Sequence, residues 1–296
     1  MDRLDLGIMR ALVVNNGVPP GIPVLRKSLR SIARDLSVDQ GTVRSRMKRL
    51  QKQGVLRGWY LGVGPGLTGH SVAQVRLEVD PRRDKRSLVN QLLKVEGVER
   101  VCIYLGSKLS LVLLYKGESD LNASLKSVAK VVGSDRLFHT EAASRAPDRA
   151  VTQTDLAIIG SLQKDPWKPY AALAKELRLS VRTVNRRIAG LSESGAIYML
   201  PDIDLKALQG IVPAELVIQY ESADQRNLVN ERIMPRIQDE LVFSNLSETQ
   251  GYFALSVVNA SRVEQITEWA KQHKGVRGVH AEVLQDVILN PNHYRR

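Results

Sequence analysis

The sequence predicts an α+β fold in which a block of three helices and a βαββαβ domain each occur twice. The first observation behind this is an internal repeat, because Leu36–Leu50 aligns with Leu177–Leu191 at an offset of 141 residues. The second is periodicity: each half begins with apolar residues at helical spacing and continues with segments that alternate as strands do. A length of 296 residues with 43% apolar residues is sufficient for several small globular domains. Together these observations predict two copies of one two-part unit.

The repeat carries six identical pairs, which are Leu36/Leu177, Thr42/Thr183, Val43/Val184, Arg46/Arg187, Leu50/Leu191 and Gly54/Gly195. Upstream, Asp5–Ile8 matches Asp155–Ile158 at an offset of 150 residues. The difference between the two offsets predicts nine extra residues in the first copy. We place them in Asn15–Pro23, because its Gly and Pro residues are typical of a loop.

Each unit opens with three predicted helices. In the first copy their inward positions are, helix by helix, Leu4, Ile8 and Leu12; Leu25, Leu29, Ile32 and Leu36; and Val43, Met47 and Leu50. In the second copy they are Leu156, Ile159 and Leu162; Leu173 and Leu177; and Val184, Ile188 and Leu191. Asp39 and Ser180 are expected to cap the third helices, which end near Gly54 and Gly195. Three short helices with a tight turn before the third are typical of a helix-turn-helix domain.

The remainder of each unit follows the order strand, helix, strand, strand, helix, strand, which is typical of a ferredoxin-like antiparallel sheet. In the first copy we expect strands near residues 75–79, 101–105, 109–115 and 136–142, and helices near 85–93 and 120–132. In the second copy we expect strands near 216–220, 241–247, 252–258 and 279–287, and helices near 226–237 and 263–271. The expected domains are therefore helix-turn-helix at 1–60 and 151–200, and sheet at 61–150 and 201–296.

The net charge of +12 lies entirely in the first half of the chain. Residues 1–150 contain 26 Lys and Arg against 14 Asp and Glu, whereas residues 151–296 contain 17 of each. This asymmetry predicts a polyanionic partner that engages the first half more strongly. The alternative is a basic protein whose charge serves solubility alone.

Several classes of protein are disfavoured by the sequence. No run approaches the ~18 apolar residues of a membrane span, and Met1–Asp5 lacks the order of a signal peptide, so we expect a cytoplasmic protein without a membrane partner. The single cysteine, Cys102, excludes an intramolecular disulfide and a cysteine-cluster metal site. His70, His139, His273 and His280 show no metal-ligand spacing. With no catalytic motif in view, we expect no enzyme activity, catalytic residue, metal or cofactor.

The outer face of the first unit's third helix is strongly basic. From Gln40 to Leu77 there is no acidic residue, although a solvated helix normally interleaves both signs. We therefore expect DNA phosphates to supply the missing negative charge. Because the first turn of a recognition helix reaches base edges and later turns meet the backbone, the base contacts are assigned to Gln40, Arg44 and Ser45. The phosphate contacts are assigned to Lys48, Arg49 and Lys52.

Arg46 flanks the apolar stripe of the same helix, so it is expected to pack or pair within its own domain. In the second unit the outer DNA-binding candidates are Arg182, Asn185 and Arg186. Asn185 has the side chain that can read adenine. Ala189 and Gly190 replace Lys48 and Arg49, so the second block is expected to bind DNA more weakly or to serve as a structural partner.

The whole arrangement resembles the Lrp/AsnC family, the feast/famine transcription regulators. The best local matches are Asp155–Ile159, Leu173–Leu177 and Thr183–Ile188, and the first copy matches through Thr42–Met47 and Gly54–Leu56. The resemblance implies winged-helix-like helix-turn-helix domains alternating with sheet domains of the RAM/ACT-like kind. It also implies that one chain imitates a family dimer with its sheet domains face to face, and that chains form homo-oligomers, either dimers of tandem chains or larger assemblies.

The resemblance further implies a small-molecule effector, an amino acid, bound near a Gly-x-x-Asp-type turn between the middle strands. The corresponding segments here begin Gly106-Ser107 and Gly251-Tyr252, and neither contains the acid. These four residues are the candidate effector-binding residues. Glu248, three residues before Gly251, is an alternative partner for the ammonium group of an effector.

Two other functions remain open. A protein that coats DNA as an architectural element, without sequence choice, would carry the same basic helix, because phosphate contacts supply affinity and base contacts supply specificity. Haem-biosynthetic decarboxylases that act on sirohaem resemble this two-part architecture as well. Such an enzyme would need His and Arg side chains in the sheet domains to hold tetrapyrrole carboxylates. The favoured hypothesis is a sequence-specific regulator bound to double-stranded DNA, with the first helix-turn-helix dominant.

Overall fold

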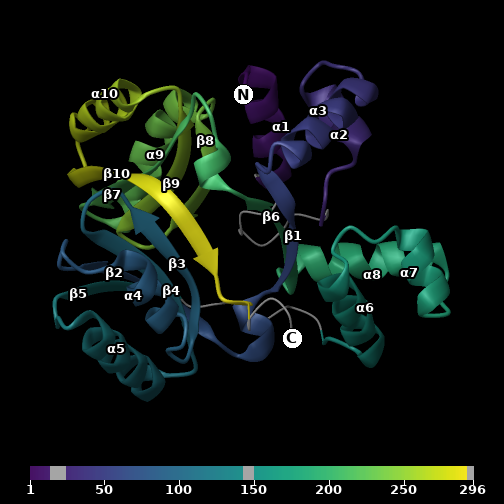
Figure 1. The fold of residues 1–296 in the computed structure, drawn as a ribbon, viewed down its shortest axis with the longest axis horizontal. Helices are drawn as coiled ribbons and strands as arrows, with labels where there is room; N and C mark the ends of the chain where they lie inside the picture. Colours follow the sequence, from purple (N-terminus) through teal and green to yellow (C-terminus); the bar gives the residue numbers. More distant parts are fainter. Residues whose placement is uncertain (14–24, 143–149, 292–296) are drawn as a thin grey trace.

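The computed structural model describes residues 1–13, 25–142 and 150–291, and the same order of elements occurs in it twice (Figure 1). The first unit comprises α1 (Arg3–Val13), α2 (Leu29–Asp35), α3 (Gln40–Lys52), β1 (Leu56–Val63), η1 (Pro65–Thr68), β2 (Ser71–Glu78), α4 (Lys85–Leu92), β3 (Val98–Tyr104), β4 (Lys108–Tyr115), α5 (Glu118–Val132) and β5 (Leu137–Ala142). The second comprises α6 (Gln153–Lys164), α7 (Tyr170–Glu176), α8 (Val181–Glu193), β6 (Ile197–Ile203), η2 (Leu205–Ala207), β7 (Val212–Tyr220), α9 (Ala223–Ile237), β8 (Leu241–Leu246), β9 (Gln250–Val257), α10 (Ala260–Lys271) and β10 (Val276–Leu289). The predicted α+β class is confirmed. The loop predicted at 15–23 lies outside the described residues.

The third helices begin where the sequence predicts. The Asp39 carboxylate accepts a hydrogen bond from the Thr42 backbone N–H at 2.9 Å, and the Ser180 hydroxyl accepts one from Thr183 N–H at 3.0 Å. These bonds satisfy backbone donors that an uncapped first turn leaves free. The prediction was wrong for Leu25, which was expected in the second helix. Ser28 caps α2 by accepting from Ser31 N–H, so the helix starts at Leu29 and Leu25 precedes it.

The turn before each third helix contains a residue in the left-handed backbone region. Ser37 and Arg178, which are equivalent in the repeat, both have φ of +54°. A side chain in this conformation costs roughly 1–2 kcal/mol relative to glycine. Both units nevertheless adopt this backbone conformation, because the chain must reverse its direction within a few residues to place the third helix against the second.

We expect Ser37→Gly to stabilise the first helix-turn-helix domain by about 0.5–1 kcal/mol, because glycine removes the left-handed strain but adds entropy to the unfolded chain. Ser31→Gly, in the body of α2, is the matched control and should destabilise by about 0.5 kcal/mol. Hydrogen exchange of the α2 and α3 amides measures both changes. Effects of the same sign for the two variants would contradict the strain at Ser37.

The two ferredoxin-like domains share one eight-stranded sheet with the strand order β5-β2-β4-β3-β10-β7-β9-β8. Each half of that order repeats the same arrangement of four strands. The long strand β10 joins the halves, since residues 276–283 pair with β7 and residues 284–289 pair with β3. Helices α4 and α5 cover the first half, and α9 and α10 cover the second half on the opposite side of the molecule (Figure 1).

The faces of the sheet that carry no helices contact each other between the two halves. On β2, Val75 and Leu77 pack under the helices, whereas Arg76 points the other way and forms an ion pair with Glu215 of β7. The Tyr104 hydroxyl donates to the same carboxylate at 2.9 Å. Thr140 and Tyr252 share a further hydrogen bond of 2.9 Å. The sheet domains are therefore joined along one edge and also packed face to face.

The two helix-turn-helix domains are linked by a ribbon of two antiparallel strands, β1 and β6, which the sequence analysis did not predict. Leu56 pairs with Ile203 and Val63 with Ile197, so the two domains lie at opposite ends of the ribbon (Figure 1). Trp59 of β1 packs against the hydrophobic cores of both domains. The boundaries expected at residues 60 and 200 fall inside these two strands, each of which serves both domains.

Candidate nucleic-acid interface

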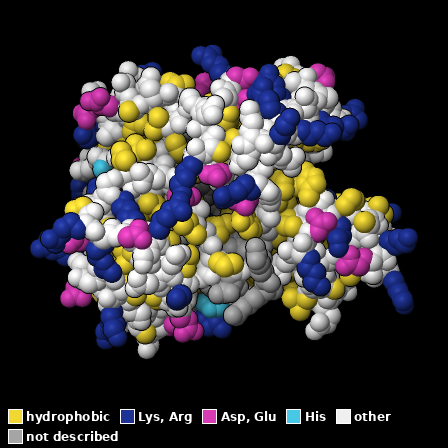
Figure 2. Space-filling view, viewed as in Figure 1, with side chains coloured by type: hydrophobic (Ala, Val, Ile, Leu, Met, Phe, Trp, Pro, Cys, Tyr) yellow, Lys and Arg dark blue, Asp and Glu magenta, His cyan; other side chains and the backbone are white. Residues whose placement is uncertain are grey.

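Helix α3 places a row of cations on the surface of the first helix-turn-helix domain. Val43, Met47 and Leu50 face the core, so the opposite side of the helix is exposed. The predicted DNA-binding residues Gln40, Arg44, Ser45, Lys48, Arg49 and Lys52 are all exposed. Figure 2 shows Lys and Arg side chains gathered over α2 and α3, at the upper right of the molecule. Arg44, Lys48 and Lys52 form no ion pair with another described residue.

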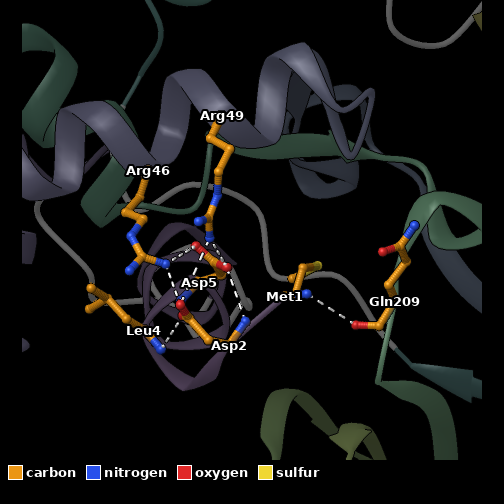
Figure 3. Close-up of polar contacts among 7 residues, drawn as sticks. All are labelled: Met1, Asp2, Leu4, Asp5, Arg46, Arg49 and Gln209. Carbon is orange, nitrogen blue, oxygen red and sulfur yellow. Dashed lines mark hydrogen bonds and ion pairs between the residues drawn. The ribbon is translucent and has the colours of Figure 1, made fainter.

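Two arginines of α3 instead form ion pairs with carboxylates at the N-terminal end of α1. Arg46 forms ion pairs with Asp2 and Asp5, and Arg49 forms them with the same two residues (Figure 3). Asp5 is completely buried, whereas 43% of the Arg49 side chain is exposed. The expectation that Arg46 pairs within its domain is confirmed. Arg49, expected to bind phosphate, has its charge compensated inside the protein, so it contributes less free charge than Lys48 or Lys52.

Asp2 also acts as the cap of α1. Its carboxylate accepts hydrogen bonds from the backbone N–H groups of Leu4 and Asp5, each at 3.0 Å, and the Asp5 carboxylate accepts one from Asp2 N–H at 3.0 Å. The hydrogen bond from Arg46 lowers the pKa of the Asp2 carboxyl from 3.8 to about 2, and the Asp5 N–H contributes further. A lowered pKa means that this stabilisation is complete above pH 4 and is lost as the pH falls toward 2.

The second unit repeats this construction at equivalent positions. Asp155 is completely buried, and its carboxylate accepts a hydrogen bond from Arg187 of α8 at 3.1 Å. Thr152 caps α6 in a reciprocal capping box with Asp155. Arg187 and Asp155 correspond to Arg46 and Asp5 in the repeat. The first and third helices of both domains are thus joined by an arginine and a buried aspartate.

Two further cations of the acid-free segment are compensated by the second half of the chain. Arg57 forms ion pairs with Asp202 at 2.8 Å and Asp204 at 3.5 Å, and Arg76 pairs with Glu215. The expectation that external phosphates supply the counter-charge of the whole segment is therefore wrong for the paired arginines. Folding places Asp202, Asp204 and Glu215, which are distant in the sequence, beside Arg57 and Arg76. Among the cations of this segment, Arg44, Lys48 and Lys52 form no ion pair with a described residue and are left for an external partner.

Helix α2 adds cations that the sequence analysis missed. Arg30 is exposed, and so is 80% of the Arg34 side chain, which lies 3.7 Å from the carboxylate of its neighbour Asp35. In a helix-turn-helix domain the helix before the recognition helix crosses the DNA backbone. Arg30 and Arg34 lie one turn apart on the helix before α3, and this spacing could have identified them as DNA-contact candidates.

The outer face of α8 carries the three candidates of the second unit. Arg182, Asn185 and Arg186 are exposed, and so is 45% of Val181 at the first position of the helix. Ala189 and Gly190 follow where α3 has Lys48 and Arg49. The second face is therefore less basic than the first, as the sequence indicates.

The four candidate effector residues are divided between two environments. Gly106 and Ser107 lie in the β3–β4 turn, where Ser107 donates a hydrogen bond to Glu78 at 2.7 Å. Gly251 and Tyr252 were expected at a turn but lie within β9, because the turn from β8 ends at Thr249. Tyr252 is almost fully buried beside Arg76. A cavity of about 90 Å³ lies elsewhere, between α1 and the second sheet domain, and is lined mainly by aliphatic side chains.

The histidines are not assembled into a metal site, since no group of three His, Cys, Asp or Glu side chains in the described residues has the required proximity. His280 lies beside Arg76 at 3.4 Å, and burial together with the arginine charge lowers the pKa of its ring. Burial raises the pKa of the Cys102 thiol. Within the described ranges, every helix is too short or too polar to span a bilayer.

Comparisons of the sequence with known proteins identify one of these domains. Residues 151–192 match the AsnC-type helix-turn-helix domain. The transcriptional regulator Ptr1 of Methanocaldococcus jannaschii is 33% identical over 99 residues, which is 33% of this chain and 60% of that protein. The transcriptional regulator LysM of Sulfurisphaera tokodaii is 28% identical over 130 residues, covering 44% of this chain and 89% of that protein. The chain thus spans less than two thirds of the length of Ptr1.

Ptr1 and LysM are both named as transcriptional regulators, in agreement with the expectation of a non-enzymatic protein.

Comparison of the structures shows a similar fold over nearly the whole chain. The crystal structure of the siroheme decarboxylase NirDL superposes with a TM-score of 0.51, covering 97% of this chain and 92% of that one. The sequences are 14% identical in this alignment. At this identity the similarity concerns the fold alone.

Proposed function

We propose that this chain, whose residues 151–192 match the AsnC-type helix-turn-helix domain, is a sequence-specific DNA-binding regulator of the Lrp/AsnC kind in which one chain presents two helix-turn-helix domains as a family dimer does. The first domain dominates DNA contact, and double-stranded DNA is the partner. The observation that carries the proposal is the set of three exposed cations on α3 that form no ion pair with any residue that the structure describes, namely Arg44, Lys48 and Lys52.

The charge distribution supports DNA as the partner. The fold compensates Arg46 and Arg49 with Asp2 and Asp5, which shows that acids are available next to this helix. It nevertheless leaves the outer row of α3 without acids. Like charges one turn apart on a helix repel each other, and a phosphate backbone relieves this repulsion while releasing counterions.

The arrangement of the two domains supports dimer mimicry. The units have the same element order, and two pairs of strands join them, β1 with β6 and β3 with β10. The N-terminal ammonium group donates to Gln209 O at 3.4 Å, so the first domain also contacts the second half (Figure 3). A chain built this way presents two different recognition helices and suits an asymmetric DNA site.

The finer features of the proposal are an amino-acid effector and further association of chains into homo-oligomers. The candidate effector residues remain Gly106, Ser107, Gly251 and Tyr252, of which Ser107 is the accessible polar side chain in a turn. Calorimetric titration of the protein with the twenty amino acids tests the effector. Sedimentation of the protein alone and with DNA tests the assembly.

The experiment that tests the function is selection of bound sequences from random 40-base-pair duplexes, followed by titrations of Arg44→Ala and Lys48→Ala. If Arg44 contacts a base, its loss should cost about 1–3 kcal/mol on the selected duplex and relax the preference at one position. Loss of the Lys48 phosphate contact should weaken selected and random duplexes alike and reduce the salt slope by about 1.

Lys94→Ala is the control for charge, because this exposed lysine follows α4 in the first sheet domain. It should bind both duplexes as the wild type does. Enrichment of no sequence, with equal affinity for all duplexes, would favour the architectural protein over the regulator. Unchanged binding of both α3 variants would overturn the assignment of this helix.

A further inference from the structure

One arginine of the first helix-turn-helix domain reaches into the second. Arg26 precedes α2, and its guanidinium donates to the backbone oxygens of Pro166 at 3.1 Å and Lys168 at 2.8 Å. These residues form the connection between α6 and α7. Two hydrogen bonds from one planar guanidinium fix both the distance and the orientation of the acceptors.

Aromatic rings enclose the same guanidinium. It lies 5.0 Å from the centre of the Trp167 ring and 4.5 Å from that of Tyr170. Trp167 also stacks on Trp59 of the β1–β6 ribbon, with ring centres 4.5 Å apart and an angle of 24° between the planes. Leu25, next to Arg26, is 2% exposed in the hydrophobic core of the second domain. We call Leu25, Arg26, Trp59 and Trp167 the brace.

The brace matters because the ribbon alone does not fix the angle between the domains. A two-stranded ribbon has large and variable twist, and by itself is marginally stable. The ribbon is roughly 23 Å long over its seven residue steps from Leu56 to Val63, at ~3.3 Å per residue. Rotation about that axis would swing α8 relative to α3. The hydrogen bonds and stacked rings of the brace oppose this rotation by tying Trp59, in the middle of the ribbon, to the α6–α7 connection of the second domain.

We propose that Arg26 and Trp167 are positioning residues that fix the angle and distance between α3 and α8, and so set the spacing between the two DNA segments that the chain accepts. The inference rests on the proposed function, because it concerns the DNA site that this function requires. Specificity would then reside partly in residues that touch no base. Two recognition helices held rigidly accept only the spacing that matches the helical turn of DNA, about 10.5 base pairs.

The DNA test uses the duplex enriched by the wild type from the random pool, and a second duplex with two base pairs inserted between its contacted segments. The insertion rotates one segment by about 70° relative to the other. Wild-type protein should bind the lengthened duplex at least about tenfold more weakly. Arg26→Ala should reduce this difference to about threefold or less, because the second domain can turn to follow the DNA.

Three variants separate positioning from charge and from stability. Lys27→Ala removes the same charge from the adjacent residue, which pairs with Asp35 of its own domain at 2.9 Å, and should retain the tenfold discrimination. Arg26→Lys keeps the charge without the planar two-bond geometry and should behave as Arg26→Ala does. Trp167→Phe keeps an aromatic ring in place and should retain discrimination.

A DNA-free measurement distinguishes failure of the brace from failure of the proposed function. Spin labels on Gln51→Cys in α3 and Glu193→Cys in α8, both exposed positions, report the distance between the helices when Cys102 is replaced by Ser. The distance distribution should be at least about twice as wide with Arg26→Ala as with Lys27→Ala. Equal widths would overturn the brace even if the protein selects DNA. Absence of DNA selection with the expected broadening would overturn the proposed function and, with it, the consequence for spacing.

Discussion

Replacing Arg44, Lys48 and Lys52 together by Gln is expected to reduce affinity for DNA by about 100- to 1,000-fold at low salt. The physical reason is that these cations are exposed and form no ion pair within the described part of the chain, so the triple variant loses the Arg44 base contact together with the counterion release of the Lys48 and Lys52 phosphate contacts. The slope of log affinity against log salt concentration should fall by about 2, one for each lost phosphate contact. Fluorescence anisotropy over a salt series measures both quantities.

The matched control replaces Lys94, Lys126 and Lys130 by Gln, which removes the same charge from exposed positions of the first sheet domain. It should change the salt slope by less than about 0.5, because distant charges act only through a screened field. Equal losses in the two triple variants would show that overall charge, rather than the surface of α3, attracts DNA.

Replacing Asp5 by Asn is expected to destabilise the first helix-turn-helix domain by about 2–3 kcal/mol. Removing one partner of a fully buried ion pair costs about 3–5 kcal/mol. The cost should be smaller here, because Arg46 and Arg49 are partly exposed and can turn toward solvent. A change of this size accelerates hydrogen exchange of the α1 and α3 amides by about 30-fold or more, if exchange proceeds by opening of the domain.

Asp155→Asn is the reciprocal control, because Asp155 is equally buried and pairs with Arg187 in the second domain. Asp155→Asn should accelerate hydrogen exchange of the α6 and α8 amides and leave those of α1 and α3 unchanged. Exchange that changes equally in both domains for either variant would mean that the two domains unfold as one unit. No change in α1 and α3 would contradict the stabilising role of the Asp5 ion pairs.

Much of the local structure could be predicted from the sequence. The cap residues Asp39 and Ser180 precede α3 and α8 as expected, and the βαββαβ order occurs in both sheet domains. These features depend on residues within a few positions of one another, so periodicity and side-chain chemistry specify them. The ribbon was missed because β1 contains two glycines and β6 a proline, and because the two strands pair between residues that are 134 to 147 positions apart, from Val63–Ile197 to Leu56–Ile203.

The sequence predicted which cations of the candidate site point outward, but not which of them are paired with acids distant in the sequence. The outward positions of Arg44 and Lys48 follow from the helix period around Val43. The pairing of Arg57 with Asp202 does not, because the two residues are 145 positions apart and meet only when β1 pairs with β6. A segment without acidic residues in the sequence can therefore still have acidic side chains beside it in the folded protein.

By itself the sequence determined the repeated order of helices and strands, the caps that start the third helices and the outward face of α3. Only the tertiary structure decided which cations stay uncompensated, and that Leu25 and Arg26 of the first domain contact the second. The reason is that helix and strand formation responds to neighbours along the chain. The compensation of a charge and the angle between domains depend instead on residues that the folded path of the chain brings together.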